Sequence, residues 1–308
     1  MNRNTAVFIF IFTIGILYSC SSNQELSAQE ISGQTVPESE TFTEPSRAEQ
    51  VMRAILAAYP DKVEKVEFRN GDWAVLMGNI WFYYADGKLL PESQLKNADN
   101  YRSYQFYSYP AVLPPWRTHT PEEMERFKSW TVNRRESTTL RSSFFLDALW
   151  QAPNRTEAEQ QLVRINFLGK PMRIHKSIQS NLTVIETQIR NAARTDSLVQ
   201  PWINSLGTPA GYSWRNIADS QSRSYHSYGL AIDLLPVSLG RRQTYWLWTS
   251  QHREDWWNVP YSERYHPPAS VIRIFEANGF VWGGKWALYD TMHFEYRPEI
   301  LKLNGILP

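Results

Sequence analysis

The chain has 308 residues, with 32 Lys or Arg against 31 Asp or Glu, so its formal net charge is +1. This length allows one large domain or two modest ones. No block of basic residues is long enough to follow a phosphate backbone, which argues against nucleic-acid binding through a basic face. The single cysteine, Cys20, excludes an intrachain disulfide and a zinc site built on cysteines.

The first 20 residues have the pattern of an export signal. A short charged start precedes an almost wholly apolar run from Ala6 to Leu17, which is short for a membrane span. The string Leu17-Tyr18-Ser19-Cys20 resembles the lipobox of bacterial lipoproteins, although Tyr18 stands where a small residue is usual. We therefore predict a lipoprotein signal peptide over residues 1–20 with lipidation at Cys20; an ordinary signal peptide is the alternative. The protein is expected to be exported and lipid-anchored in a bacterial cell envelope, at the periplasmic face or the outer membrane.

Residues 21–45 are rich in Ser, Glu, Gln and Thr and poor in large apolar side chains, which predicts a disordered tether. Residues 46–155 are predicted to form an N-terminal α/β region. Its first helix begins at the capping box Ser46-Arg47-Ala48-Glu49 and stops at Pro60. Short β-prone runs joined by Asn-Gly and Asp-Gly pairs then predict an antiparallel meander. The meander is either an attachment for a substrate or partner or a structural cap.

Further helices are predicted after the meander. Thr120-Pro121-Glu122-Glu123 opens a helical region that runs, with a break, toward Trp150. A second helix is expected from Thr156 to about Gly169, and a long third one from about Ile178 to Arg194. Pro267-Pro268 opens a last helix, which Asn278-Gly279 closes.

The stretch Ser224–Asp233 carries the most chemistry. Gly229 is a turn that leads into a short buried strand over Leu230–Leu235, so that Asp233 lies on an otherwise apolar strand. A buried carboxylate is costly unless a cation or several donors meet it, and His226 can share that cation. A lone His–Asp pair can equally be a structural hydrogen bond.

Asp290 and His293 supply a second carboxylate and a second imidazole later in the chain. Two His and one Asp around a metal with an open position form a hydrolytic zinc site. We expect a turn through Asp290–Met292 and a strand beginning near His293. Glu295 then shares a face with His293, and it either orients that imidazole or is solvated.

The first of these stretches reads Ser-x-His-x-x-Gly-x-Ala-x-Asp over Ser224–Asp233. The second reads Gly-Phe-x-Trp-Gly-Gly-x-Trp over Gly279–Trp286, followed by Asp-x-x-His-Phe over Asp290–Phe294. Together they resemble the M15 peptidases, the zinc D-alanyl-D-alanine carboxypeptidases and L-alanyl-D-glutamate endopeptidases of bacterial cell walls and phage endolysins. The resemblance runs from about Phe167 to Tyr296.

This resemblance assigns expected roles to individual residues. It implies that zinc is bound by His226, Asp233 and His293. It implies that Asp290 is the catalytic carboxylate and that Arg215 steadies the substrate carbonyl or its oxyanion. Three further residues are candidates for the substrate pocket: Tyr212, Ser224 and Trp286. Two His and one Asp would also accept divalent ions other than Zn²⁺.

The predicted fold is α+β, with a C-terminal M15/hedgehog-like zinc peptidase domain over residues 156–308 that contains a small antiparallel sheet and packed helices. The predicted activity is hydrolysis of an amide bond in the peptidoglycan stem peptide. Asp-x-x-His with Gly-Gly-x-Trp resembles the L-alanyl-D-glutamate endopeptidase branch; a D-alanyl-D-alanine carboxypeptidase is the alternative. A zinc-containing module that binds wall peptides without cutting them is the alternative from another class. The expected partners are a peptidoglycan peptide and, through Cys20, a membrane, with no nucleic acid.

Overall fold

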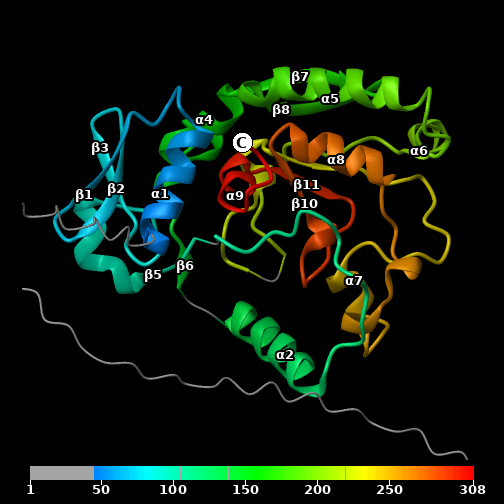
Figure 1. Ribbon diagram of the computed structural model, residues 1–308, viewed down its shortest axis with the longest axis horizontal. Coiled ribbons are helices and arrows are strands. Elements are labelled where there is room, and N and C mark those ends of the chain that lie inside the picture. The colour runs from blue at the N-terminus through cyan, green and yellow to red at the C-terminus, as the bar shows by residue number, and fades with distance from the viewer. Residues whose placement is uncertain (1–44, 105, 137–138, 219) are drawn as a thin grey trace, which may run out of the picture. The chain divides into compact units, whose positions relative to one another are not determined.

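Figure 1 shows a computed structural model of the chain, which describes residues 45–104, 106–136, 139–218 and 220–308. Helices alternate with small sheets, and Pro45–Pro308 is one compact unit. The predicted signal peptide with Cys20, and the tether up to residue 44, lie outside the described residues. Within the described part, no helix has the length and apolar character needed to cross a membrane.

The helices and strands are distributed along the whole described chain. The α-helices are α1 (Arg47–Ala58), α2 (Pro121–Glu136), α3 (Phe144–Trp150), α4 (Arg155–Gln160), α5 (Gln179–Ala192), α6 (Val199–Ser205), α7 (Trp246–Ser250), α8 (Ala269–Ala277) and α9 (Pro298–Leu303). The strands are β1 (Lys65–Arg69), β2 (Asp72–Met77), β3 (Ile80–Tyr83), β4 (Leu90–Pro91), β5 (Tyr101–Arg102), β6 (Leu140–Arg141), β7 (Leu162–Phe167), β8 (Lys170–His175), β9 (Ala231–Asp233), β10 (Phe280–Trp282) and β11 (His293–Tyr296). Short 3₁₀-helices are η1 (Glu92–Asn100), η2 (Lys176–Ile178), η3 (Tyr225–Tyr228), η4 (Trp256–Asn258), η5 (Tyr261–Glu263) and η6 (Gly283–Lys285).

The predicted meander is confirmed. Strands β1 to β4 pair in sequence order, each antiparallel to the next. Asn70 and Gly71, with φ of 51° and 84°, form the left-handed turn between β1 and β2 that favours Asn-Gly. The preceding helix α1 begins as predicted, because the Ser46 side chain accepts a hydrogen bond from the backbone N–H of Glu49.

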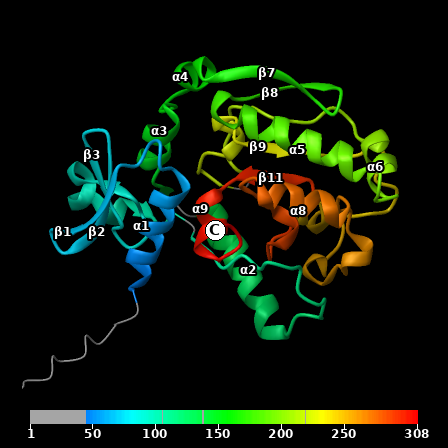
Figure 2. The same cartoon turned by 45° about the horizontal axis from the view of Figure 1, so that its top comes forward.

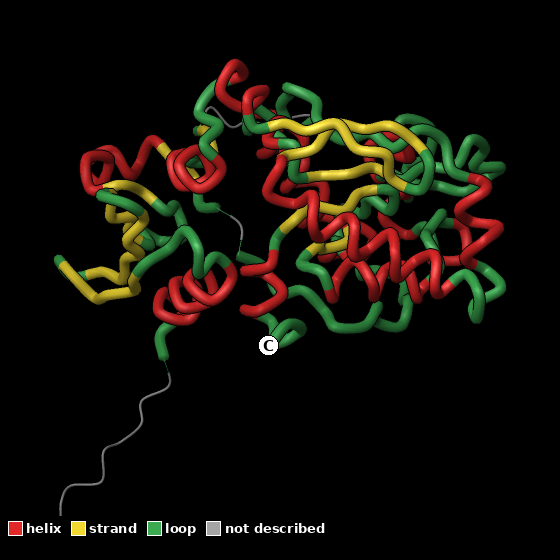
Figure 3. Tube along the Cα trace, turned by 90° about the horizontal axis from the view of Figure 1, so that it is seen from above, coloured by secondary structure: helices red, strands yellow, loops and turns green. Residues whose placement is uncertain are grey.

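The helix predicted from Thr156 to Gly169 is wrong over most of its length. Helix α4 ends at Gln160, and the chain then forms the antiparallel hairpin β7–β8, seen as two neighbouring yellow strands in Figure 3. Leu168 and Gly169 make its turn with φ of 51° and 81°. Gly-containing left-handed turns favour hairpins. Val163, Ile165 and Phe167 alternate with the polar Arg164 and Asn166, a pattern typical of a strand that the helix prediction overlooked.

Three short strands carry the predicted catalytic motifs. They pair antiparallel in the order β10-β11-β9, and β11 begins at His293 after a turn, as predicted. In this register His293 lies directly opposite Asp233, and residues in such a pair project from the same face. On the other face, Phe294 stacks on Phe275 of α8 at 4.1 Å, and α8 packs on α5 (Figure 2). The sheet therefore holds two motif residues side by side.

One buried apolar cluster extends through the described part of the chain. It includes Val51 and Ile55 of α1, Trp150 of α3 and Phe294 of β11. Helix α1 also packs against α9. The proposed division of the chain at residues 155 and 156 stays a prediction.

Candidate active site and metal centre

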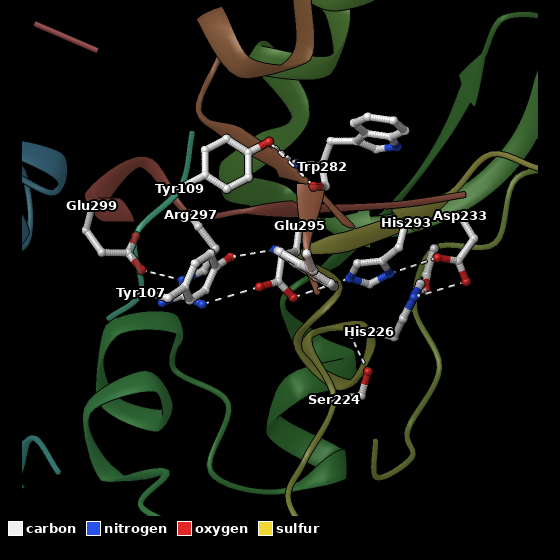
Figure 4. A network of polar contacts seen from close by, with 12 residues as sticks. Tyr107, Tyr109, Ser224, His226, Asp233, Trp282, His293, Glu295, Arg297 and Glu299 are labelled. Carbon is white, nitrogen blue, oxygen red and sulfur yellow. Dashed lines mark hydrogen bonds and ion pairs between the residues drawn. The ribbon is translucent and has the colours of Figure 1, made fainter. Parts of the chain in front are cut away.

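Three potential metal ligands converge where β9, β11 and η3 meet. His226 lies on η3, Asp233 ends β9 and His293 begins β11. Their ligand atoms lie within 4.8 Å of one another. Asp233 Oδ2 is 3.2 Å from Nε2 of His226, and its Oδ1 is 2.9 Å from Nδ1 of His293 (Figure 4). The structure thus brings together the three residues that the sequence singled out as ligands.

The orientation of His226 is fixed by backbone atoms. Its Nδ1 lies 2.6 Å from the carbonyl oxygen of Gly211, and a carbonyl can only accept, so Nδ1 carries the proton. Nε2 then holds a lone pair toward Asp233, is buried and has no hydrogen-bond partner of proper geometry in the described part of the chain. Gly211 is pressed against β8, since a Cβ there would lie 2.2 Å from the carbonyl oxygen of Arg173. Ser224 caps η3 by accepting from the N–H of His226.

The orientation of His293 is fixed by Glu295, two residues along the same strand. Nε2 of His293 is 3.3 Å from Glu295 Oε2, while Nδ1 faces Asp233. Burial would raise the pKa of Glu295, but its bond to His293 and the charge of Arg297 outweigh burial and lower that pKa. An ionised Glu295 can only accept hydrogen bonds, so Nε2 of His293 carries the proton and donates to it. Nδ1 then presents its lone pair toward Asp233. Of the two predictions for Glu295, the structure favours the orienting role.

The acceptor atoms of this cluster suit a divalent cation. Asp233 and the two ring nitrogens that face it are all acceptors in the neutral tautomers. Without a metal, burial would lower the pKa of His293, yet the hydrogen bonds to Asp233 and Glu295 outweigh burial and raise it. Burial would likewise raise the pKa of Asp233, but His226 and His293 lower it. A divalent ion bound by two imidazoles and one carboxylate would replace the proton in satisfying these acceptors.

Asp290 lies beside the cluster in a close-packed turn. Its backbone N–H donates to the carbonyl of Gly283, and a Cβ on Gly283 would lie 2.4 Å from the carbonyl oxygen of Asp290. Its Oδ1 is buried without a hydrogen-bond partner in the described structure. Burial raises the pKa of Asp290 to about 7; the charges of His293 and Arg215 oppose this rise, and that of Asp233 adds to it. Asp290 can therefore hold and release a proton near neutral pH.

A pocket of about 500 Å³ opens beside the cluster, and Tyr212, Arg215, His226 and Asp233 are among its lining residues. The Arg215 side chain is exposed, but its backbone N–H donates to the hydroxyl of Ser227, which donates in turn to the Arg215 carbonyl. These bonds hold the backbone of Arg215 at the pocket, and its exposed side chain adds a positive charge there.

Two predicted pocket residues lie elsewhere. Ser224 does not line the cavity, and its hydroxyl caps η3. Trp286 packs against the ring of His293, with ring centroids 5.6 Å apart, and donates to the hydroxyl of Tyr107. Both residues therefore support ligand positions.

Behind His293 runs a buried chain of charges (Figure 4). Arg297 lies between Glu295, at 3.3 Å, and Glu299, and the hydroxyl of Tyr59 in the loop after α1 donates to Glu299 at 2.5 Å. These side chains are almost fully buried. These buried charges, together with the Tyr59 hydroxyl, therefore link His293 to the end of helix α1.

Comparison with known proteins agrees with this geometry. Residues 217–296 match a family model of the M15 peptidases described as D-alanyl-D-alanine carboxypeptidase. The match supports an M15-family peptidase. Residues 51–106 match a second family model, described as a domain of unknown function. No curated protein and no solved structure matches the chain.

Sequence reasoning missed Gly211 and Ser227 as residues that support the candidate site. Gly211 acts through its carbonyl oxygen, and no residue pattern reveals which carbonyl meets an imidazole. Ser227 lies inside the recognised motif, at a position where the pattern leaves the residue free. Their contributions follow only from the three-dimensional arrangement.

Proposed function

We propose that this protein is a zinc-dependent hydrolase of an amide bond in the peptide stem of peptidoglycan. One observation carries the proposal: Nε2 of His226 and Nδ1 of His293 both face Asp233, while their other ring nitrogens contact Gly211 and Glu295. The family match supports the peptidase class. A zinc ion held by these residues would supply Lewis-acid activation of water and of a substrate carbonyl.

The remaining chemistry is assigned to two side chains. Asp290 takes the proton of the attacking water and passes it to the leaving amine, a role that suits a carboxyl with a pKa of about 7. Arg215 offers its guanidinium where the substrate carbonyl oxygen becomes negative.

The first candidate for the cleaved bond is the L-alanyl-D-glutamate bond, because Asp290-x-x-His293 after Gly283-Gly284-x-Trp286 resembles the endopeptidase branch. The D-alanyl-D-alanine bond is the second candidate, because the matching family model is described as a D-alanyl-D-alanine carboxypeptidase. The released fragment distinguishes the two.

We also propose a place for this reaction in the cell. Residues 1–20 would direct export and leave Cys20 lipidated. Residues 21–45 would then tether the rest of the protein to the bilayer. The substrate would then be reached from the periplasmic face or the outer membrane. In the part of the protein after this tether, residues 156–308 form the proposed peptidase domain.

The test incubates the zinc-loaded protein with purified peptidoglycan, with and without a chelator, and identifies released fragments by mass spectrometry. We expect release that the chelator abolishes. Asp290→Asn should lower the rate by roughly 10²- to 10⁴-fold and keep its zinc, because it removes only the proton carrier. Asp233→Asn should lose both zinc and activity. Asp255→Asn, an exposed aspartate beside Arg253, is the matched control and should behave as wild type.

Three results would change the proposal. A protein that keeps zinc and releases nothing would be a wall-peptide binding module. Full activity in Asp290→Asn would assign the proton transfer to another group. Release of free D-alanine alone would establish the carboxypeptidase candidate.

A further inference from the structure

Three arginines line the pocket beside the metal cluster: Arg164, Arg173 and Arg215. Arg215 has its role in the proposed reaction, whereas the other two come from the hairpin β7–β8. That hairpin precedes residues 217–296, the segment that matches the peptidase family model. The pocket therefore has a cationic wall that the family match does not cover.

Arg164 and Arg173 are direct cross-strand partners. Such partners project from the same face of a hairpin, and two like charges in that position repel each other. Both side chains are exposed, and among the described residues no carboxylate lies within ion-pair distance of either. Glu159, on which the charge of Arg173 acts, is already paired with Arg155 at 2.9 Å. Two guanidinium groups that repel each other, and that have no ion-pair partner among the described residues, favour an anion between them.

The position of Arg173 is further fixed by Tyr212. Its guanidinium lies over the Tyr212 ring, 5.0 Å from the centroid, and the Tyr212 backbone N–H donates to the Arg173 carbonyl at 2.8 Å. Tyr212 itself lines the pocket, and its hydroxyl donates to Glu159. A stacked guanidinium has less conformational freedom to lose when it binds an anion.

We propose that Arg164 and Arg173 form a subsite for a free carboxylate of the substrate peptide. A guanidinium pair matches the planar, two-oxygen geometry of a carboxylate. His226 and Asp233 line the same cavity, so the recognised carboxylate belongs to the molecule whose amide bond is cut. This inference rests on the proposed function and adds a substrate class to it: peptides with a free carboxylate close to the scissile bond.

The subsite is tested by binding as well as by turnover. The full-chain protein is titrated, in the presence of a chelator, into a fluorescent peptide that contains L-alanyl-D-glutamate and ends in D-alanyl-D-alanine. Arg164→Gln and Arg173→Gln should each raise Kd about tenfold, as expected for a lost charged hydrogen bond. Lys170→Gln removes a positive charge from the same hairpin outside the pocket and should leave Kd unchanged. The zinc-loaded variants should show the same rise in KM with kcat retained.

Two modified peptides identify the carboxylate. One carries an amide at its C-terminus, and the other carries an amide at the free carboxyl of its glutamate. Weaker binding of either peptide to the wild type, with no further loss in the arginine variants, supports the subsite and names its ligand. Arginine variants that bind the unmodified peptide like the wild type would overturn it, as would two amidated peptides that bind at full strength.

The outcomes also separate this inference from the proposed function. Cleavage by the wild type with unchanged KM in both arginine variants would overturn the subsite and keep the hydrolase. Arginine-dependent binding without any cleavage would support the subsite and remove the hydrolase.

Discussion

His175 is buried like His226 and His293, yet its surroundings give it a structural role. Its Nδ1 accepts the backbone N–H of Ser177, so its Nε2 carries the proton and donates to the carbonyl of Trp150 at 3.0 Å. Both nitrogens are thus satisfied in the neutral ring. Burial lowers the pKa of His175 to about 4, because a charged ring would lose its solvation.

This histidine should make the fold sensitive to mild acid. In the unfolded chain the pKa of a histidine is about 6.5, so below that pH the unfolded state binds a proton that the folded state refuses. The free energy of unfolding should therefore fall as the pH drops from 6.5 toward 4, by up to about 3 kcal/mol from this residue. Urea unfolding at a series of pH values measures the loss. In His175→Gln, whose amide cannot titrate, the fall over that window should be smaller; equal falls in both proteins would contradict the assignment.

At the residue scale, the sequence predicted the candidate ligand side chains better than the residues that orient them. His226, Asp233 and His293 were identifiable because metal ligands must be particular residue types at fixed spacings. Gly211 was not identifiable, because its contribution is a carbonyl oxygen that any residue possesses. The glycine is required only because the backbone of Arg173 lies so close. A close approach between distant segments leaves no local pattern.

At the element scale, turns that need glycine or asparagine were the reliable guide. Asn70-Gly71 marked the first meander turn correctly. The hairpin β7–β8 was missed because the alternation of apolar and polar residues over Val163–Phe167 was overlooked and because Leu168 adopts a positive φ that leucine rarely takes. Tertiary contacts also stabilise the hairpin, since β8 docks on the segments around Gly211 and Gly229 through backbone hydrogen bonds.

The docking of β8 predicts a strong effect of Gly211→Ala. The new Cβ would overlap the Arg173 carbonyl, so the loop must move and carry the Gly211 oxygen away from His226. We expect a loss of about 1–3 kcal/mol in the free energy of unfolding and a weaker affinity for zinc. Denaturant unfolding and zinc competition with a chelator measure the two effects.

Gly207→Ala is the control for that variant, because its Cβ would meet only the Leu235 carbonyl at 3.4 Å. It should perturb both quantities much less. A Gly211→Ala protein with the stability and zinc affinity of the wild type would show that the loop is not held against β8.

At the scale of the whole molecule, helix α1 and the strand β11 that carries His293 share one core. Tyr59, which caps the end of α1, donates to Glu299 of α9, and both side chains are buried. Tyr59→Phe leaves the Glu299 carboxylate with one donor fewer, which should cost about 1–3 kcal/mol of unfolding free energy. Tyr84→Phe removes the hydroxyl of a partly exposed tyrosine and should cost much less.

The shared core also predicts a single unfolding transition. Tryptophan fluorescence and far-UV circular dichroism should give coincident curves for the wild type and for Tyr59→Phe. Separate transitions would mean that the region of α1 unfolds independently of the sheet that carries His293.

The buried charges behind His293 have a practical consequence for the construction of chimeras. The segment that matches the peptidase family ends at Tyr296, one residue before Arg297 and three before Glu299. It also begins after Gly211. A graft of that segment alone would carry all three candidate ligands but leave Glu295 without the Arg297 guanidinium and His226 without the Gly211 carbonyl. A functional graft must follow the supporting contacts, which reach from Tyr59 to Glu299, and not the span of the homology.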